Sequence, residues 1–232
     1  MLQPPTLFKS LRPFSLVVAL VSCGLGVALA LLAQQGGGVR ATVIVLAGLL
    51  LQAGVNLIND QSDLPLLQGD ALEPVRRVIR RHTRWGMSCI GMSMLVGMVL
   101  VVDVGWSLVG LIVLGLIGAL GYTTEPLHYK RRGLGVPLVF WLMGVLMIVG
   151  AYHAMGAPLS WDVVWLSFPV SMLVALLLLS NELRDWESDC RQGVLTLTVR
   201  LGFARGCQLY LLMLASTYLL ALLLWQQGLL LR

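Results

Sequence analysis

The sequence predicts an all-α membrane protein, a polytopic bundle of about seven transmembrane helices, on three observations. Hydrophobic residues make up 58% of the chain and charged residues only 12%, against about 45–50% and about 25% in soluble domains. The apolar residues fall in blocks of about 17–25, the length that crosses a bilayer as a helix. The basic residues lie in short segments between these blocks, which is typical of membrane topology. The sequence therefore excludes an ordinary soluble enzyme, and its net charge of +5 does not require nucleic acid as a partner.

Windows of about 19 residues locate the spans. We expect them at residues 14–34, 41–60, 87–103, 107–124, 136–154, 163–182 and 208–230. The first span follows Lys9 and Arg12, as a cleaved signal would, but about 20 apolar residues exceed the 7–15 of a signal peptide. We expect residues 1–232 to form a single integral membrane domain.

The distribution of charge predicts the orientation of the bundle. Fourteen of the sixteen Lys and Arg residues fall on one side of the span pattern, and only Arg40 and Arg232 fall opposite. Because cytoplasmic loops are enriched in Lys and Arg, we expect the N-terminus and the large loops in the cytoplasm and the C-terminus outside. Nine of the eleven acidic residues gather on that same side. Acidic residues contribute little to topology, so their gathering indicates a site.

Two acidic motifs end the second and sixth spans, NLINDQSD from Asn56 and NELRDWESD from Asn181. At about 100° per residue, the Asn and Asp side chains of each motif fall on one helical face. Both motifs begin Asn-x-x-x-Asp and stand 125 residues apart, which indicates an internal duplication. The two predicted stripes are Asn56, Asp60 and Asp63, and Asn181, Asp185 and Asp189.

Carboxylates at the end of a membrane span require water or cations nearby. An isolated Asp at the centre of a membrane helix costs about 2.5–3.5 kcal/mol, so several together predict a polar, water-accessible cavity. Ligands with oxygen only suit Mg²⁺, which one or two carboxylates hold while substrate phosphates complete its shell. We interpret the six residues as metal ligands that clamp one diphosphate. The alternative is that they are interfacial helix caps and solvated loop charges.

On these residues the chain resembles the UbiA superfamily of membrane prenyltransferases, and most closely its 1,4-dihydroxy-2-naphthoate polyprenyltransferase branch. The stretch Asn181 to Gly202 is similar to that branch's N-x-x-R-D-x-x-x-D-x-x-x-G-x-x-T-L-x-x-x-x-G. The first motif, followed by Gly69-Asp70, is similar to N-x-x-N-D-x-x-D…G-x-D, although Pro65-Leu66-Leu67 disrupts its spacing and leaves the role of Asp70 open. Further matches are Arg12-Pro13, Tyr122-Thr123 with Pro126, and Arg132-Gly133-Leu134-Gly135.

The resemblance implies a Mg²⁺-dependent transfer of a polyprenyl group from a polyprenyl diphosphate to an aromatic acceptor in menaquinone-type quinone biosynthesis. The implied acceptor is 1,4-dihydroxy-2-naphthoate, which would lose its carboxylate. It also implies a multi-pass protein of a bacterial inner membrane with its active-site loops cytoplasmic. Family members usually have about nine spans, so we expect a UbiA-like bundle that lacks the usual last two helices. We then expect membrane lipids, or a second copy of the chain in a homo-oligomer, to complete its wall.

The remaining site residues follow from the charge of a diphosphate leaving group, which metals and cations stabilise. We assign catalytic roles to Asp60, Asp185 and Arg184, and to Tyr122 for orienting substrate or shielding an allylic cation. Ordinary alternatives exist, since Tyr122 ends a span and the basic residues also anchor topology. The predicted substrate-binding residues are Asn59, Lys130, Arg131 and Arg132.

Two other functions compete with the enzyme. A divalent-cation transporter would also place acidic residues in the membrane. It predicts polar residues across the whole membrane, whereas residues 41–54 and 163–179 are nearly all apolar. A non-catalytic relative that binds polyprenyl diphosphate is the second alternative.

Overall fold

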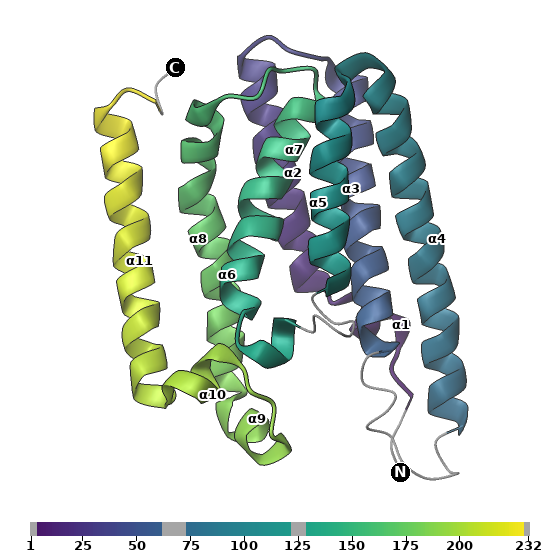
Figure 1. Cartoon of the computed structure of the whole chain (residues 1–232), viewed down its shortest axis with the longest axis vertical. Coiled ribbons are helices and arrows are strands. Elements are labelled where there is room, and N and C mark those ends of the chain that lie inside the picture. The colour runs from purple at the N-terminus through teal and green to yellow at the C-terminus, as the bar shows by residue number, and fades with distance from the viewer. Residues whose placement is uncertain (1–3, 62–72, 122–128, 230–232) are drawn as a thin grey trace.

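The computed structural model of the chain describes residues 4–61, 73–121 and 129–229, which form a bundle of helices with no strand among them (Figure 1). Six helical segments are long and apolar enough to cross a membrane, and α5 is a shorter apolar helix of 16 residues. Each of the seven expected spans corresponds to one of these segments. The all-α transmembrane bundle is therefore confirmed.

The helices follow one another with short connections. η3 is a 3-10 helix and η4 is π-helical. The elements are α1 (Leu7–Leu11), α2 (Pro13–Leu32), α3 (Gly38–Asn59), α4 (Glu73–Val104), α5 (Trp106–Gly121), η3 (Tyr129–Arg132), α6 (Gly135–Val139), η4 (Phe140–Leu146), α7 (Met147–Ala154), α8 (Trp161–Arg184), α9 (Trp186–Gln192), α10 (Leu197–Leu201) and α11 (Phe203–Gln226).

Both acidic motifs lie at one end of the bundle, the lower end in Figure 1. The N-terminus lies at this end and the C-terminus at the other, as an odd number of spans requires. We call the first the motif end and the other the far end. The assignment of the motif end to the cytoplasm remains a prediction from the distribution of charge.

The chain enters the bundle through a sharp turn at the motif end. The Thr6 hydroxyl caps α1 by accepting a hydrogen bond from the Lys9 N–H at 3.3 Å. Arg12 then adopts a left-handed conformation, with φ 49° and ψ 72°, and Pro13 occupies the first position of α2. Proline suits that position because it has no N–H to satisfy and its φ is already helical. The short helix α1 is thereby set apart from α2 and lies across the ends of α3 and α4.

Small residues permit the closest helix contacts. Gly26 of α2 meets the backbone of α7 at Ile148, where a side chain would collide. Gly54 of α3 and Gly86 of α4 face each other, and a Cβ on either would lie within 2.8 Å of the other's carbonyl oxygen. Close approach at small residues is a usual basis of helix packing in membranes. These contacts hold α2 to α7 and α3 to α4.

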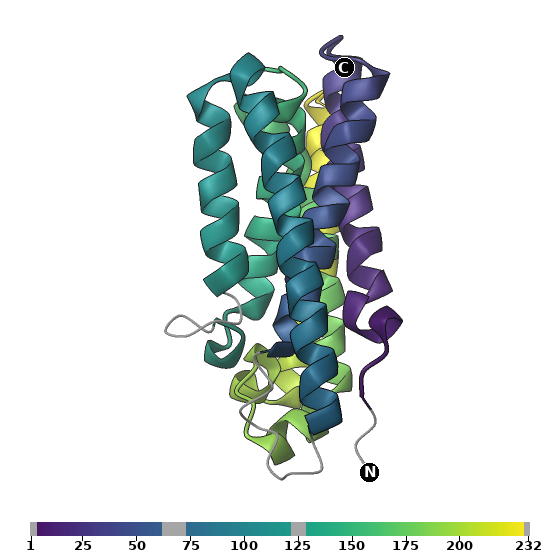
Figure 2. The same cartoon turned by 90° about the vertical axis from the view of Figure 1, so that its right-hand side faces the viewer.

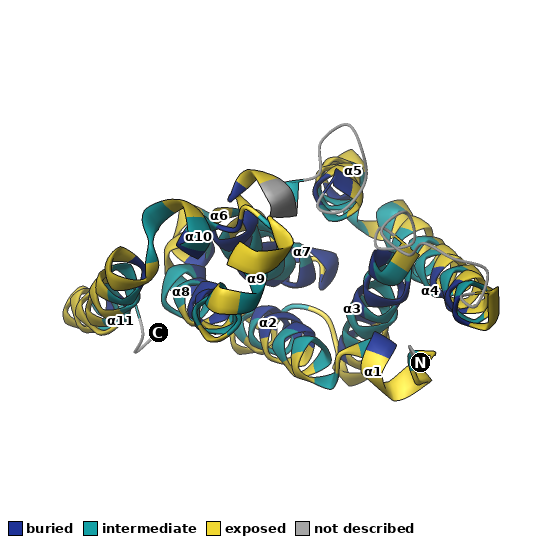
Figure 3. Cartoon of the chain, turned by 90° about the horizontal axis from the view of Figure 1, so that it is seen from below, coloured by how far each residue is buried: buried dark blue, intermediate teal, exposed yellow. Residues whose placement is uncertain are grey.

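The burial of residues matches a lipid surround (Figure 3). Buried residues face the inside of the bundle, while the outer faces of α4 and α11 are largely exposed and apolar. α11 lies at the edge of the bundle and packs mainly along α8 (Figure 1). Exposed apolar side chains on a transmembrane helix contact lipid tails, so this exposure costs nothing in a membrane.

α4 is longer than the predicted span at 87–103 and begins at Glu73 (Figure 2). Its added turns are amphipathic, because Val75, Ile79 and His82 are buried while the arginines on the other face are exposed. One of these, Arg81, lies 5.2 Å from the centre of the exposed Trp85 ring. The span prediction stopped short because it counted hydropathy, whereas this segment is helical by its 3.6-residue periodicity.

Candidate active site

A cavity of about 510 Å³ runs through the bundle between the two motifs. Along α3 its lining reaches from Ile44 to Asn59, a separation of fifteen residues in sequence or about 22 Å of helix. Most of the lining is aliphatic or methionine side chains from α2, α3, α4, α5, the segment 139–154 and α8. Apart from Ser93, whose hydroxyl donates to the Ala47 carbonyl oxygen at 2.9 Å, the polar side chains gather at the motif end, and they are Arg12, Ser15, Gln52, Asn56, Asn59, Asn181 and Arg184. The cavity is therefore a polar mouth that continues into an apolar chamber.

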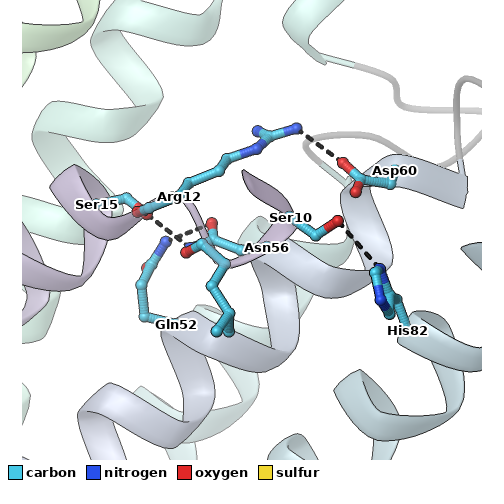
Figure 4. A network of polar contacts seen from close by, with 8 residues as sticks. Ser10, Arg12, Ser15, Gln52, Asn56, Asp60 and His82 are labelled. Carbon is cyan, nitrogen blue, oxygen red and sulfur yellow. Dashed lines mark hydrogen bonds and ion pairs between the residues drawn. The ribbon is translucent and has the colours of Figure 1, made fainter. Parts of the chain in front are cut away.

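The first motif forms one side of this mouth through Asn56, which is 2% exposed (Figure 4). Its Nδ2 donates to the Leu11 carbonyl oxygen at 2.7 Å and to the Ser15 hydroxyl at 2.6 Å. Its Oδ1 accepts a hydrogen bond from Gln52 Nε2 at 3.0 Å. A single amide thus joins α3 to the turn between α1 and α2, so Asn56 orders the mouth as well as lining it.

Asp60 caps the C-terminal end of α3 and forms an ion pair with Arg12, at 3.4 Å between Oδ1 and Nη2. The Asp60 side chain is 17% exposed and the Arg12 side chain 41%. Beside this pair, the Ser10 hydroxyl lies 3.1 Å from Nδ1 of His82, and both residues are buried. Figure 4 shows these contacts converging on the end of α3. They fasten α1 to both α3 and α4.

The second motif forms the opposite side of the mouth through Asn181 and Arg184. Arg184 holds Asp185 with two parallel hydrogen bonds of 2.9 Å, from Nε to Oδ1 and from Nη2 to Oδ2. The hydrogen bonds and charge of Arg184 hold the pKa of the Asp185 carboxyl below its ordinary value. Asp185 is therefore ionised at neutral pH, as a metal ligand must be.

The second motif is not one continuous helical stripe, which corrects the sequence prediction. α8 ends at Arg184, Asp185 adopts φ −92° and ψ 4°, and α9 begins at Trp186. The Asp185 N–H donates to the Asn181 carbonyl oxygen and the Asp189 N–H donates to the Asp185 carbonyl oxygen, so the chain bends at Asp185 while its backbone hydrogen bonds continue. Asp189 lies in α9, where its carboxylate accepts a hydrogen bond from the Thr196 hydroxyl at 3.4 Å.

The bend is held by a buried contact that the sequence did not reveal. The Glu182 carboxylate accepts a hydrogen bond from the Thr198 N–H at 3.2 Å, and the Glu182 carbonyl accepts one from the Thr198 hydroxyl at 3.2 Å. Glu182 is 8% exposed and Thr198 is fully buried. This pairing holds α10 against the end of α8, and α9 therefore turns away from the axis of α8.

The structure brings four of the predicted site residues together on the cavity wall: Asn56, Asn59, Asn181 and Arg184. Three carboxylates lie outside the lining: Asp60 at the end of α3, Asp185 at the end of α8 and Asp189 in α9. These helix ends share one end of the bundle (Figure 1). The exposed Arg132, in η3, is also outside the lining. Asp63, Asp70, Tyr122 and the side chains of Lys130 and Arg131 lie outside the described residues.

Sequence reasoning gave no role to three polar residues of the mouth, Arg12, Ser15 and Gln52. Gln52 stands four residues before Asn56 and eight before Asp60, so the helical stripe could have been extended to find it. Ser15 and Arg12 reach the site from another helix. No spacing within the two acidic motifs could have identified them, although the family resemblance already included Arg12-Pro13.

A profile of the UbiA prenyltransferase family matches residues 19–231. The chain is 27% identical over 217 residues to the 1,4-dihydroxy-2-naphthoate octaprenyltransferase of Haemophilus influenzae, covering 86% of this chain and 70% of the relative. It is 28% identical over 214 residues to the 2-carboxy-1,4-naphthoquinone phytyltransferase of Synechocystis, covering 89% and 69%.

The fold also matches a solved structure, that of a UbiA homolog from Archaeoglobus fulgidus bound to GPP and Mg²⁺. The TM-score is 0.70 at 16% identity, over 92% of this chain and 75% of the other. At that identity the match establishes a shared fold.

Proposed function

The chain belongs to the UbiA prenyltransferase family, and we propose that it transfers a polyprenyl group from a polyprenyl diphosphate to 1,4-dihydroxy-2-naphthoate in a Mg²⁺-dependent reaction. The observation that carries this proposal is the cavity, whose polar mouth and apolar chamber match the two ends of a prenyl diphosphate. The chain would act as a single integral membrane domain, with its mouth at the cytoplasmic face.

The residues at the motif end fit Mg²⁺ through the chemistry of their donor atoms. Asp60, Asp185 and Asp189 offer carboxylate oxygens, and Arg184 holds the pKa of Asp185 below its ordinary value. The described part of the chain contains no cluster of three or more His, Cys, Asp or Glu suited to a metal ion. That is compatible with Mg²⁺, which typically takes only one or two carboxylates and completes its shell with substrate phosphates and water.

When bound with the diphosphate, Mg²⁺ would neutralise the negative charge that develops on the leaving group. Asp60 and Asp185 would hold it from the two sides of the mouth, with Asp189 following in α9; Asp63, outside the described residues, stays a predicted ligand. Asn56 and Asn181 would contribute amide oxygens, although hydrogen bonds already position the Asn56 amide.

Arg12 and Arg184 would bind the diphosphate oxygens directly, because both residues line the mouth and one comes from each side. Their charge is permanent, and guanidinium binds phosphate oxygens in bidentate fashion. Both are already oriented by carboxylates, Arg12 by Asp60 and Arg184 by Asp185. The groups that stabilise the leaving diphosphate are therefore in place before substrate binds.

The apolar chamber would hold the prenyl tail and keep water away from the allylic carbon as its C–O bond breaks. Most of the chamber lining, such as Leu116, Leu142 and Leu178, offers no nucleophile that could trap a prenyl cation. The exceptions are Cys23, which is buried, and Ser93, whose hydroxyl bonds to the Ala47 carbonyl oxygen. Positioning and exclusion of water are sufficient protein contributions to such a reaction. The same apolar wall argues against the transporter, because an ion path would need polar groups along its length.

The choice of acceptor rests on the relatives, whose names specify naphthoate or naphthoquinone acceptors. The test incubates the purified protein with octaprenyl diphosphate, Mg²⁺ and either 1,4-dihydroxy-2-naphthoate or 4-hydroxybenzoate, and identifies products by mass spectrometry. We expect prenylation of the naphthoate with release of CO₂, abolished by EDTA and restored by Mg²⁺.

Transfer to 4-hydroxybenzoate alone would show that the proposed acceptor is wrong, while the proposed prenyltransferase activity would still hold. Tight binding of a non-hydrolysable octaprenyl thiodiphosphate, together with no transfer from octaprenyl diphosphate to any acceptor, would instead identify a non-catalytic relative. The variant Asp60→Asn/Asp185→Asn is the control for background transfer.

A further inference from the structure

One glycine on the cavity wall faces open space. Gly150 of α7 lines the chamber, and a Cβ built on it would have no heavy atom within 4 Å. We propose that Gly150 determines which prenyl tails the chamber accepts, by leaving open a recess that a long tail occupies and a short tail does not reach. This inference rests on the proposed function, because it takes the chamber as the site of the tail.

The other glycines of the wall are filled by their neighbours. A Cβ on Gly48 would collide with Cys23, one on Gly97 would lie 3.0 Å from Ile112, and one on Gly115 would lie 3.6 Å from Leu146. These three glycines allow helices or side chains to pack. Gly150 does not serve packing in this way, so its missing side chain leaves volume in the chamber itself.

The lining side chains of the helical segment 139–154, which carries Gly150, change in size along its length. Toward the motif end its lining side chains are bulky, and toward the far end they are small. In chain order they are Val139, Leu142, Met143, Leu146, Met147, Gly150, Ala151 and Ala154. Because the lining side chains are small from Gly150 onward, the chamber is wider there, and we call this wider part, near the far end, the recess.

A hydrogen bond fixes the depth of this recess. Arg40 Nε of α3 donates to the Ala154 carbonyl oxygen at 2.8 Å, so these residues stand at one level. α3 and α7 run in opposite directions (Figure 1), and four residues inward from each bond partner are Ile44 and Gly150, both on the cavity wall. Asn56 of the mouth is twelve residues beyond Ile44, or about 18 Å at 1.5 Å per residue.

Tail length decides which donors reach this depth. An extended polypeptide spans about 3.5 Å for every three bonds of its main chain. At the same length per bond, an extended geranyl chain spans roughly 9 Å and an extended octaprenyl chain roughly 37 Å. A geranyl tail anchored by its diphosphate at the mouth ends well before Gly150. An octaprenyl tail can reach the recess and fill it, so only long donors should depend on Gly150.

The experiment fills the recess and compares donors. Gly150→Leu and Gly150→Phe add side chains where the structure has space, at a helical position whose φ is not positive. The matched control is Gly24→Phe in α2, since a Cβ there also meets nothing within 4 Å but Gly24 does not line the cavity. Each purified variant is assayed with geranyl and with octaprenyl diphosphate.

We expect Gly150→Phe to lower the octaprenyl-to-geranyl ratio of kcat/KM at least tenfold, Gly150→Leu to lower it less, and Gly24→Phe to leave it unchanged. An unchanged ratio in both Gly150 variants would overturn the inference, and so would an equal loss with both donors. An equal loss would mean that the substitution damages the protein generally or that the tail leaves the chamber before this depth.

A binding measurement separates this inference from the proposed function. Dissociation constants of geranyl and octaprenyl thiodiphosphates, which cannot transfer their prenyl group, are measured for the same variants. Weaker binding of the long analogue alone in Gly150→Phe supports the inference even if the wild type transfers nothing, a result that would refute the proposed function only. Equal affinity changes for both analogues would refute the role of Gly150 while leaving the transfer reaction intact.

Discussion

At the end of α3 the polar side chain of the first motif is built into the packing of the bundle, whereas the charged pair of the second motif, Arg184 and Asp185, is held within the motif itself. Asn56 is buried and bonds to Leu11, Ser15 and Gln52. Asn181 is half-buried, and Asp185 pairs with the adjacent Arg184. Two motifs with the same Asn-x-x-x-Asp pattern thus differ in how they are supported.

The difference separates two requirements that a metal and diphosphate site combines. The first motif sets the shape of the mouth, because its amide joins helices that are distant in sequence. The second motif supplies charge that is free to adjust, because Arg184 and Asp185 are 67% and 48% exposed. Chemistry should therefore depend on both motifs equally, and stability should depend mainly on the first.

The largest effect should come from removing one carboxylate charge on either side. We expect Asp60→Asn and Asp185→Asn each to lower kcat by about 10²–10³-fold or more, the usual cost of losing one group that stabilises developing charge. Initial rates at saturating Mg²⁺ and donor measure this. Near wild-type activity in either variant would mean that the two motifs do not act as one clamp.

The next effect concerns the two guanidinium groups of the mouth. Arg12→Gln and Arg184→Gln should each raise KM for the donor by roughly 10–100-fold, because a hydrogen bond to a charged group contributes about 1.5–3 kcal/mol. Steady-state kinetics at fixed acceptor provides the values. Arg77→Gln, on the exposed face of α4 and away from the cavity, is the matched control. A donor KM unchanged in both mouth variants would place the diphosphate elsewhere.

A smaller effect should distinguish the asparagines by stability. Asn56→Ala leaves the Leu11 carbonyl and the Gln52 amide without their partner, which should lower the free energy of unfolding by about 1–3 kcal/mol. Asn181→Ala should change it by no more than about 0.5 kcal/mol. Denaturation in detergent micelles compares the two. Equal losses of stability in the two variants would contradict the claim that stability depends mainly on the first motif.

The smallest effect concerns pH. Arg184 lowers the pKa of Asp185, so the pair stabilises the folded state above the carboxyl's ordinary pKa, and this contribution disappears as pH falls through the lowered value. Because both side chains are largely exposed, the contribution should not exceed about 1 kcal/mol. Melting curves of the wild type and Arg184→Gln should differ slightly at neutral pH and converge in strong acid. A gap that widens on acidification would contradict this assignment.

The spans were predictable because lipid imposes both length and composition on a helix. The paired Asn residues were predictable because the helical period places them on one face near the end of a span. The bend at Asp185 was not, since it depends on Glu182 and Thr198, which are sixteen residues apart. The span prediction left out the start of α4, because its arginines lower the hydropathy of a segment whose other face is buried.

The mouth itself was only half predictable. Asn59 and Asn181 belong to motifs and could be found, whereas Arg12 is placed by a left-handed turn and by contacts that cross 48 residues of sequence. Composition and periodicity report only on residues close together in sequence. Because this site combines the start of one helix with the ends of two others, its residues can be predicted only when the packing of those helices is known.

The fastening of α1 also dictates the order in which the site can be made. Its contacts run from Ser10 to His82, from Leu11 to Asn56 and from Arg12 to Asp60. During synthesis, α1 therefore emerges from the ribosome well before the residues of α3 and α4 that hold it in place. The polar mouth can close only after α3 and α4 have joined the bundle, so insertion of the first span and completion of the site are separate events in biogenesis.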